Sequence, residues 1–232
     1  AGRQQPGSGG HQRQGAAADS GRILVRCSHL SDLFLLLSTM SDALSSGDDR
    51  ASWRRQLLQS RRDWATSEAA QAAQAALEAR LWPVLEQLEP ICLGVYWPIQ
   101  GEFNPSQIAC RAQRAWGTRL ALPEASKAPV AMHFVPWDGA EPTRRDACGI
   151  LTGEGRPLVP DVILVPCVGF TADGHRLGYG GGYFDRYLAA HPEVTALGVA
   201  WSQARLPEGA LQAAPHDQPL VAVVTEHDTW PV

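Results

Sequence analysis

The sequence has no large excess of charge of either sign. Its 20 lysine and arginine residues and 24 aspartate and glutamate residues give a net charge of -4 at pH 7, and the isoelectric point is about 6.0. Proteins that bind nucleic acid or lie on a membrane usually carry a basic surface, so the composition gives no argument for either partner. Any anion site must therefore be built from a few local groups, and a small-molecule partner is expected.

Paired cysteines and long apolar segments are also missing. The chain contains no Cys-x-x-Cys pair, and its five cysteines are spread over the sequence: Cys27, Cys92, Cys110, Cys148 and Cys167. This pattern favours reduced structural thiols in a cytoplasmic protein over a disulfide framework. The apolar stretch over residues 30–40 is interrupted by Asp32 and is much shorter than the roughly 20 residues that span a bilayer, so no membrane anchor is expected.

Residues 1–39 differ in composition from the rest of the chain. They are polar, rich in Gly, Gln and Arg, and without apolar periodicity, which predicts a disordered extension or upstream sequence. The scarcity of acidic residues there is also compatible with a transit peptide. Met40 opens the stretch MSDALSSGDDR, which looks like a natural amino terminus, so residues 40–232 are predicted to form the domain.

Short apolar segments and helical patterns alternate from residue 50 onward. Apolar or β-branched segments bounded by Pro, Gly or Asp predict strands over residues 91–97, 120–122, 130–134, 162–167, 196–201 and 220–225. Amphipathic or Ala- and Leu-rich patterns predict helices over residues 50–65, 68–88, 104–117 and 182–191, the second of them capped by Thr66 or Ser67. Several strands are apolar throughout, which indicates that helices cover both faces of the sheet. We therefore predict a single α/β domain, a three-layer α/β/α sandwich with a mostly parallel sheet, and a long surface loop over residues 143–160.

The segment RLGYGGGYFDRYL, residues 176–188, combines four glycines with four aromatic residues. It follows the strand predicted over residues 162–167 and runs into the helix predicted over residues 182–191. Ligands of α/β sheets bind beyond the carboxyl ends of the strands, and glycines before a helix N-terminus leave backbone N–H groups open to a phosphate. The segment is not a Walker A motif, because no Lys-Ser or Lys-Thr pair follows the glycines. Considered alone, the cluster fits a tight turn as well as a phosphate site.

The same segment, preceded by VPCVGFTADGH, resembles the signature of the 5-formyltetrahydrofolate cyclo-ligase family. Further segments match the family in the same order along residues 50–226: RASWRRQLLQSRR, VYWPIQGEFNP, LALP, HFVPW and HDQPLVAVVTE. The resemblance implies an ATP-dependent ligase that closes the ring of 5-formyltetrahydrofolate to give 5,10-methenyltetrahydrofolate, with release of ADP and phosphate. A monomeric, cytoplasmic protein with ATP and the folate as its partners is expected.

The resemblance also implies which residues form the site. Phosphoryl transfer needs positioning and charge neutralisation, so no residue is expected to act as a nucleophile. The expected ATP-binding residues are Arg50, Arg54, Arg176, Leu177, Gly178, Tyr179, Gly180, Gly181, Gly182, Tyr183 and Phe184. The expected folate-binding residues are Glu102, Tyr179, Gly180, Gly181, Gly182 and Tyr183.

Two acidic residues are candidates for a Mg²⁺ site. Mg²⁺ can be held by one or two carboxylates together with phosphate oxygens and water. Asp185 follows the glycine turn and Asp217 precedes the strand predicted over residues 220–225, two positions that can converge at one edge of an α/β sheet. Taken singly, Asp185 also fits the first turn of a helix, and Asp217 fits a turn carboxylate. Together with the family resemblance, a shared metal site is the better interpretation.

Other candidate residues have an ordinary structural explanation. A solvated basic face of the first helix is expected to hold Arg55, Arg61 and Arg62. Flat aromatic contacts to the folate could come from Tyr96, Trp97 or Phe103, although core packing explains these residues at least as well. His216 and His227 form no metal-binding spacing with other histidines, and no role is assigned to them.

Two other functions are compatible with the same fold. One is a non-catalytic protein that binds a nucleotide or a folate, which would be expected to lack Glu102 or the acidic metal ligands, and both are present here. The other is a sugar-phosphate isomerase or an acyl-transfer enzyme of similar α/β architecture, because a fold alone does not fix the chemistry. That second alternative predicts no dependence on ATP.

Overall fold

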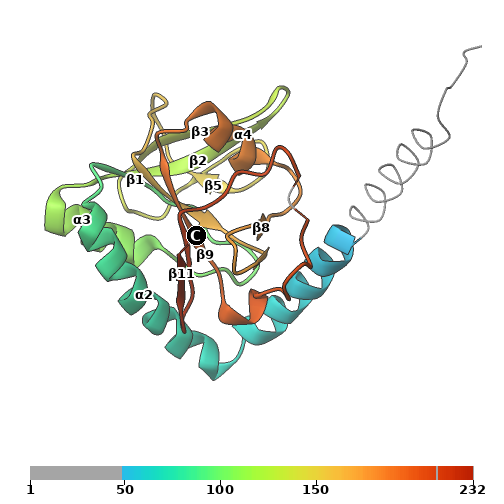
Figure 1. Ribbon diagram of the computed structural model, residues 1–232. Helices are drawn as coiled ribbons and strands as arrows, with labels where there is room; N and C mark the ends of the chain where they lie inside the picture. The colour runs from blue at the N-terminus through green and yellow to red at the C-terminus, as the bar shows by residue number, and fades with distance from the viewer. Residues whose placement is uncertain (1–48, 213, 232) are drawn as a thin grey trace, which may run out of the picture. The chain divides into compact units, whose positions relative to one another are not determined.

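The computed structural model of the protein describes residues 49–212 and 214–231 (Figure 1). The predictions for residues 1–39 and for Met40 lie outside this part of the chain. Helices span residues 49–65, Glu68–Leu88 (α2), Ser106–Trp116 (α3) and Tyr183–Ala190 (α4), and a short 3-10 helix spans Ser202–Ala204. All four predicted helices are present. Among the residues described, no helix is both long and apolar enough to cross a membrane.

A seven-stranded sheet forms the centre of the domain, with the strand order β11-β10-β9-β6-β1-β2-β3. The strands span Cys92–Gly94 (β1), Arg119–Lys127 (β2), Val130–Trp137 (β3), Val162–Pro166 (β6), Thr195–Val199 (β9), Ala222–Val224 (β10) and Thr229–Pro231 (β11). The five central strands are parallel, and the edge strands β3 and β11 pair antiparallel with β2 and β10. The predicted mostly parallel sheet is confirmed, and all six predicted strands occur in it.

Helices cover both faces of this sheet, as the apolar strands predict. On β6, Leu164 belongs to one buried cluster together with Leu77 of α2, whereas its neighbour Ile163 belongs to a second cluster together with Tyr187 of α4. Neighbouring residues of a strand point to opposite faces, so a strand that is apolar at every position contributes to both layers. Burial of each aliphatic side chain contributes about 1.5–3 kcal/mol relative to exposure. The three-layer α/β/α architecture is therefore held by two cores, one on each face of the sheet.

Some short strands differ from the prediction. The segment over residues 143–160, predicted as a surface loop, contains β4 (Arg144–Arg145) and β5 (Leu151–Thr152), which pair antiparallel. The pair of β7 (Gly169–Phe170) and β8 (Arg176–Leu177) and the edge strand β11 are also absent from the prediction. Two or three residues are too few to show the alternation by which a strand is recognised in a sequence.

The connections of the sheet favour a ligand site at the carboxyl ends of β1 and β6. From β1 the chain passes to β2 on one side, and it later enters β6 on the other side of β1, followed by β9 and β10. At such a reversal the loops after two neighbouring parallel strands separate, and open α/β sheets bind their ligands in the crevice between them.

Candidate active site

A cavity of about 530 Å³ lies beyond the carboxyl ends of β1 and β6. Its wall includes side chains of the first helix, the loop after β1, the turn between β8 and α4, and the loop before β10. Every residue that the sequence predicts for the site lines it: Arg50, Arg54, Glu102, Arg176, Leu177, Gly178, Tyr179, Gly180, Gly181, Gly182, Tyr183, Phe184, Asp185 and Asp217. The fold therefore brings the predicted residues together, although their roles remain predictions.

The glycine turn between β8 and α4 needs glycine at two positions. Gly180 and Gly182 have φ angles of 95° and 61°, in the left-handed region that other residues rarely adopt. A Cβ atom on Gly180 would lie 3.4 Å from the Arg54 guanidinium carbon, and one on Gly182 would lie 2.9 Å from Arg186 Nη1. Bare backbone at Gly180 therefore faces Arg54, as expected of a turn that accepts an anion.

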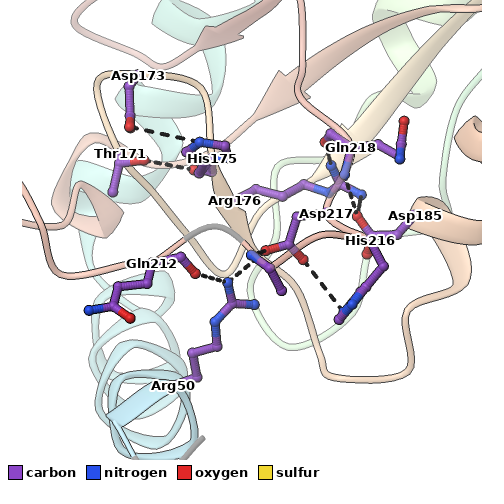
Figure 2. Close-up of polar contacts among 11 residues, drawn as sticks. Arg50, Thr171, Asp173, His175, Arg176, Asp185, Gln212, His216, Asp217 and Gln218 are labelled. Carbon is purple, nitrogen blue, oxygen red and sulfur yellow. Dashed lines mark hydrogen bonds and ion pairs between the residues drawn. The ribbon is translucent and has the colours of Figure 1, made fainter. Parts of the chain in front are cut away.

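Arg54 and Arg50 of the first helix both reach this cavity. Arg54 Nε donates a hydrogen bond of 2.7 Å to the Gly178 carbonyl. Arg50 Nη2 lies 2.6 Å from Asp217 Oδ2 (Figure 2). Burial, and after it the neighbouring charge of Arg50, lower the pKa of Arg54. The Arg54 charge is thus partly desolvated and bonded to a carbonyl rather than to a carboxylate, which suits it to an anionic ligand.

The two predicted metal ligands are each bonded to an arginine (Figure 2). Asp185 Oδ1 accepts hydrogen bonds from Arg176 Nη2 at 2.6 Å and from the backbone N–H of Gln218 at 3.2 Å. Asp217 Oδ2 accepts hydrogen bonds from Arg50 and from the Ala214 amide, both within 2.9 Å. Burial would raise the pKa of Asp217, but these hydrogen bonds outweigh it and hold the pKa below its usual value. Asp217 is therefore ionised near neutral pH.

A buried carboxylate forms another part of the cavity wall. Glu102 Oε1 accepts a hydrogen bond of 2.5 Å from the Tyr179 hydroxyl, and Glu102 Oε2 accepts one of 2.8 Å from the Ile99 amide. Arg61 Nη2 lies 3.7 Å from Glu102 Oε1 and donates a hydrogen bond to the Tyr179 oxygen. The pKa of Glu102 lies above its usual value, because the effect of burial outweighs the Tyr179 hydrogen bond and the charge of Arg61, which act in the opposite direction.

The position of Arg61 contradicts the sequence interpretation. Arg61 was expected on a solvated basic face, but its side chain is 6% exposed and forms a salt bridge with Glu102. Arg55 and Arg62 are exposed, as expected. The helical period offered a usable signal, because residue 61 lies seven positions, about two helical turns, after Arg54 and so on nearly the same face. Fully buried arginines are rare, however, so the sequence alone favours a solvent-exposed position for Arg61.

The remaining candidates divide between the cavity and the core. Trp97 lines the cavity, and Tyr96 both lines it and belongs to the buried core, with 4% of its surface exposed. Phe103 packs in the core, edge to face with Trp201 at a centroid distance of 6.1 Å. Among the residues to which the sequence assigned no role, His216 also lines the cavity. Sequence reasoning missed the loop over residues 146–150, where the Cys148 thiol lies 3.4 Å from the Tyr183 hydroxyl.

Comparison with known proteins identifies the family. A sequence model described as the 5-formyltetrahydrofolate cyclo-ligase family matches residues 46–226. The chain belongs to this family. The resemblance inferred from the sequence motifs is thereby confirmed, and the match covers the cavity residues and every helix and strand described above except the edge strand β11.

Individual members of the family are similar to the chain in sequence and fold. The 5-formyltetrahydrofolate cyclo-ligase of Mycoplasma pneumoniae is 37% identical over 76 residues, which are 32% of this chain and 44% of that protein. A solved 5,10-methenyltetrahydrofolate synthetase from Mycoplasma pneumoniae aligns with a TM-score of 0.63 and 23% identity, over 77% of this chain and 99% of that one. The solution structure of the Aquifex aeolicus 5,10-methenyltetrahydrofolate synthetase aligns with a TM-score of 0.62 and 25% identity, over 78% and 92% of the two chains. The sequence alignment thus spans less than half of the curated relative, while the structural alignments extend over nearly the whole of theirs.

Proposed function

We propose that the chain catalyses the ATP- and Mg²⁺-dependent cyclisation of 5-formyltetrahydrofolate to 5,10-methenyltetrahydrofolate, with release of ADP and phosphate. The observation that carries the proposal is one cavity whose wall contains both a glycine turn flanked by arginines and a buried Glu102 carboxylate that is hydrogen-bonded to the half-buried Tyr179. Membership of the cyclo-ligase family supports the same chemistry.

The triphosphate of ATP is assigned to the cationic part of the cavity. Arg54 lies against the bare backbone of Gly180, and Arg50 lies near by on the same helix face, one turn away. Guanidinium groups and open backbone N–H groups bind phosphate oxygens through charge-assisted hydrogen bonds. These groups would hold the γ-phosphoryl group at the glycine turn.

The folate is assigned to the part of the cavity that holds Glu102, Tyr179 and Tyr183. The Glu102 carboxylate can accept a hydrogen bond from an N–H of the pterin ring. Tyr96 and Trp97 add aromatic surface to the cavity wall near the end of β1. With the two substrates side by side, the formyl group can reach the γ-phosphorus.

The formyl oxygen is a poor leaving group, so it must be activated by phosphorylation before the ring can close. In the first step this oxygen attacks the γ-phosphorus of ATP, so an O–P bond forms, ADP leaves, and an iminium-like phosphate results. N10 of the folate then attacks the formyl carbon and loses its proton to water. Phosphate finally leaves with the electron pair of the C–O bond, which completes the methenyl bridge. No side chain forms a covalent bond, so the protein acts by positioning and by neutralising charge.

The acidic residues present are compatible with a hydrated Mg²⁺ ion. Asp185 and Asp217 line the same cavity, and the hydrogen bonds given above engage one carboxylate oxygen of each. The other Asp217 oxygen lies 3.9 Å from His216 Nε2, beyond hydrogen-bond distance, so an oxygen of each carboxylate is left for a ligand (Figure 2). No group of three or more His, Cys, Asp or Glu residues suited to a metal occurs within residues 49–212 and 214–231. Asp185 and Asp217 would therefore hold the ion jointly with phosphate oxygens and water, and the ion would neutralise charge on the phosphates.

The proposal is tested by mixing the purified protein with Mg-ATP and 5-formyltetrahydrofolate and following the ultraviolet absorbance of the methenyl product. Product is expected only when ATP is present, and Glu102→Gln, which keeps the side-chain size, is expected to raise KM for the folate. Binding of both ligands without product would favour the non-catalytic alternative. Conversion without ATP would exclude phosphorylation of the formyl oxygen, and either result contradicts the proposal.

A further inference from the structure

Arg61 connects three segments behind the wall of the cavity. Its Nε donates a hydrogen bond of 3.0 Å to the Gln100 carbonyl, and its Nη2 contacts both the Tyr179 hydroxyl and Glu102. Gln100 has a φ angle of 50°, an unusual conformation for a residue other than glycine. A single buried guanidinium therefore ties the first helix to the loop after β1 and to the glycine turn.

We propose that Arg61 is a positioning residue for the folate: it holds the Tyr179 hydroxyl and the Glu102 carboxylate in line and places its positive charge 3.7 Å from that carboxylate. The inference rests on the proposed function and deepens it, because it assigns part of folate recognition to a residue that does not itself line the cavity. Arg61 donates to Tyr179, and Tyr179 donates to Glu102, so the hydrogen bonds run in one direction toward the carboxylate.

The charge balance around Glu102 supports this role. The ionisable side chains that interact electrostatically with it are Arg61 of the first helix, Tyr179 of the glycine turn, Tyr96 after β1 and Cys167 after β6. Burial raises the pKa of Tyr96 well above its usual value and that of Cys167 to about 12, so both are neutral at physiological pH. Arg61 is therefore the cation that offsets the cost of burying the Glu102 charge.

The proposal is tested in the intact protein with Arg61→Met, which removes the charge at similar length, and Arg61→Lys, which keeps it. Arg55→Met, at an exposed position of the same helix, is the matched control. For each chain, KM for the folate and for ATP, the pH profile of kcat/KM for the folate, and the thermal midpoint are measured.

Arg61→Met is expected to raise KM for the folate by roughly tenfold or more, because the hydrogen bonds of a charged group are lost. Its KM for ATP is expected to change by less than about twofold. Its acidic limb in the pH profile is expected to shift to higher pH, because Glu102 loses its cation. Arg61→Lys is expected to keep the position of the acidic limb with a smaller rise in KM for the folate. Arg55→Met is expected to match the wild type.

Equal increases in both KM values, or an acidic limb that Arg61→Met leaves in place, would overturn the inference, since a merely structural arginine predicts those results. If Arg61→Met does not fold, Arg61→Lys decides: a rise confined to KM for the folate supports the inference, and wild-type values for both substrates overturn it. A folded wild-type protein that forms no methenyl product overturns the proposed function and the inference with it. A wild-type protein that turns over alongside unaffected Arg61 variants overturns the inference alone.

Discussion

Replacement of Arg54 by methionine tests the assignment of the triphosphate. The guanidinium of Arg54 donates from Nε to the Gly178 carbonyl, and both of its terminal nitrogens lie 3.5 Å from the position that a Cβ on Gly180 would take. Those terminal nitrogens therefore face the glycine turn. Methionine keeps much of the apolar side-chain stem and removes every donor, so the change isolates the charge and its hydrogen bonds.

The expected size of the effect follows from the bonds that are lost. A hydrogen bond to a charged group contributes about 1.5–3 kcal/mol, which corresponds to a rise of roughly 10- to 150-fold in KM for ATP if one bond to a phosphate is lost. KM for the folate is expected to change by less than about threefold, since Glu102 and Tyr179 are not bonded to Arg54. Loss of the bond to Gly178 is expected to lower the free energy of unfolding by about 1 kcal/mol.

The assay is steady-state turnover with each substrate varied in turn, combined with urea unfolding of the same samples. Arg55→Met, on the exposed side of the same helix, is the control and is expected to leave both KM values unchanged. An increase in KM that is equal for ATP and the folate, or no increase in KM for ATP, would show that Arg54 does not face the triphosphate.

Two further predictions concern the metal and the core. Asp185→Asn and Asp217→Asn are each expected to raise the Mg²⁺ concentration needed for half-maximal turnover while the circular dichroism spectrum is retained; full activity of both variants at limiting Mg²⁺ would contradict the shared metal site. The Tyr187 hydroxyl has no hydrogen-bond partner among the described residues, and burial raises its pKa from 10.0 to about 12. The stability linked to this hydroxyl is present in full below pH 10 and is lost as the pH rises toward 12. Over that interval, the free energy of unfolding measured in urea is expected to fall by up to about 2–3 kcal/mol more for the wild type than for Tyr187→Phe. Equal decreases for the two proteins would contradict this prediction.

Much of the fold could be predicted because apolar periodicity is a local property of the sequence. The strand β6 is apolar at four successive positions, and the turn at Gly180 and Gly182 directly precedes α4. Both elements can therefore be predicted from a few neighbouring residues. The pair of β4 and β5 could not be predicted in this way. Its two-residue strands are defined by their pairing rather than by their composition.

The site shows the same division between local and distant information. The cavity residues of the glycine turn follow from one contiguous motif, whereas the burial of Arg61 depends on Glu102 and on Tyr179, which lies 118 positions away in the chain. Likewise, Asp217 could be proposed as a ligand, but its bond to Arg50 joins positions separated by 167 residues. Such long-range pairs determine whether a charged side chain is buried, and no local pattern records them.

Phosphorylation of the formyl oxygen is the step on which the proposed ring closure depends. It is tested most directly with 5-formyltetrahydrofolate carrying oxygen-18 in the formyl group, turned over with unlabelled Mg-ATP in unlabelled water. Because the formyl oxygen forms the O–P bond and leaves with phosphate, one oxygen-18 atom is expected in each molecule of released phosphate, visible as an isotope shift in phosphorus NMR or by mass spectrometry. Methenyl product formed together with unlabelled phosphate would contradict the proposed mechanism.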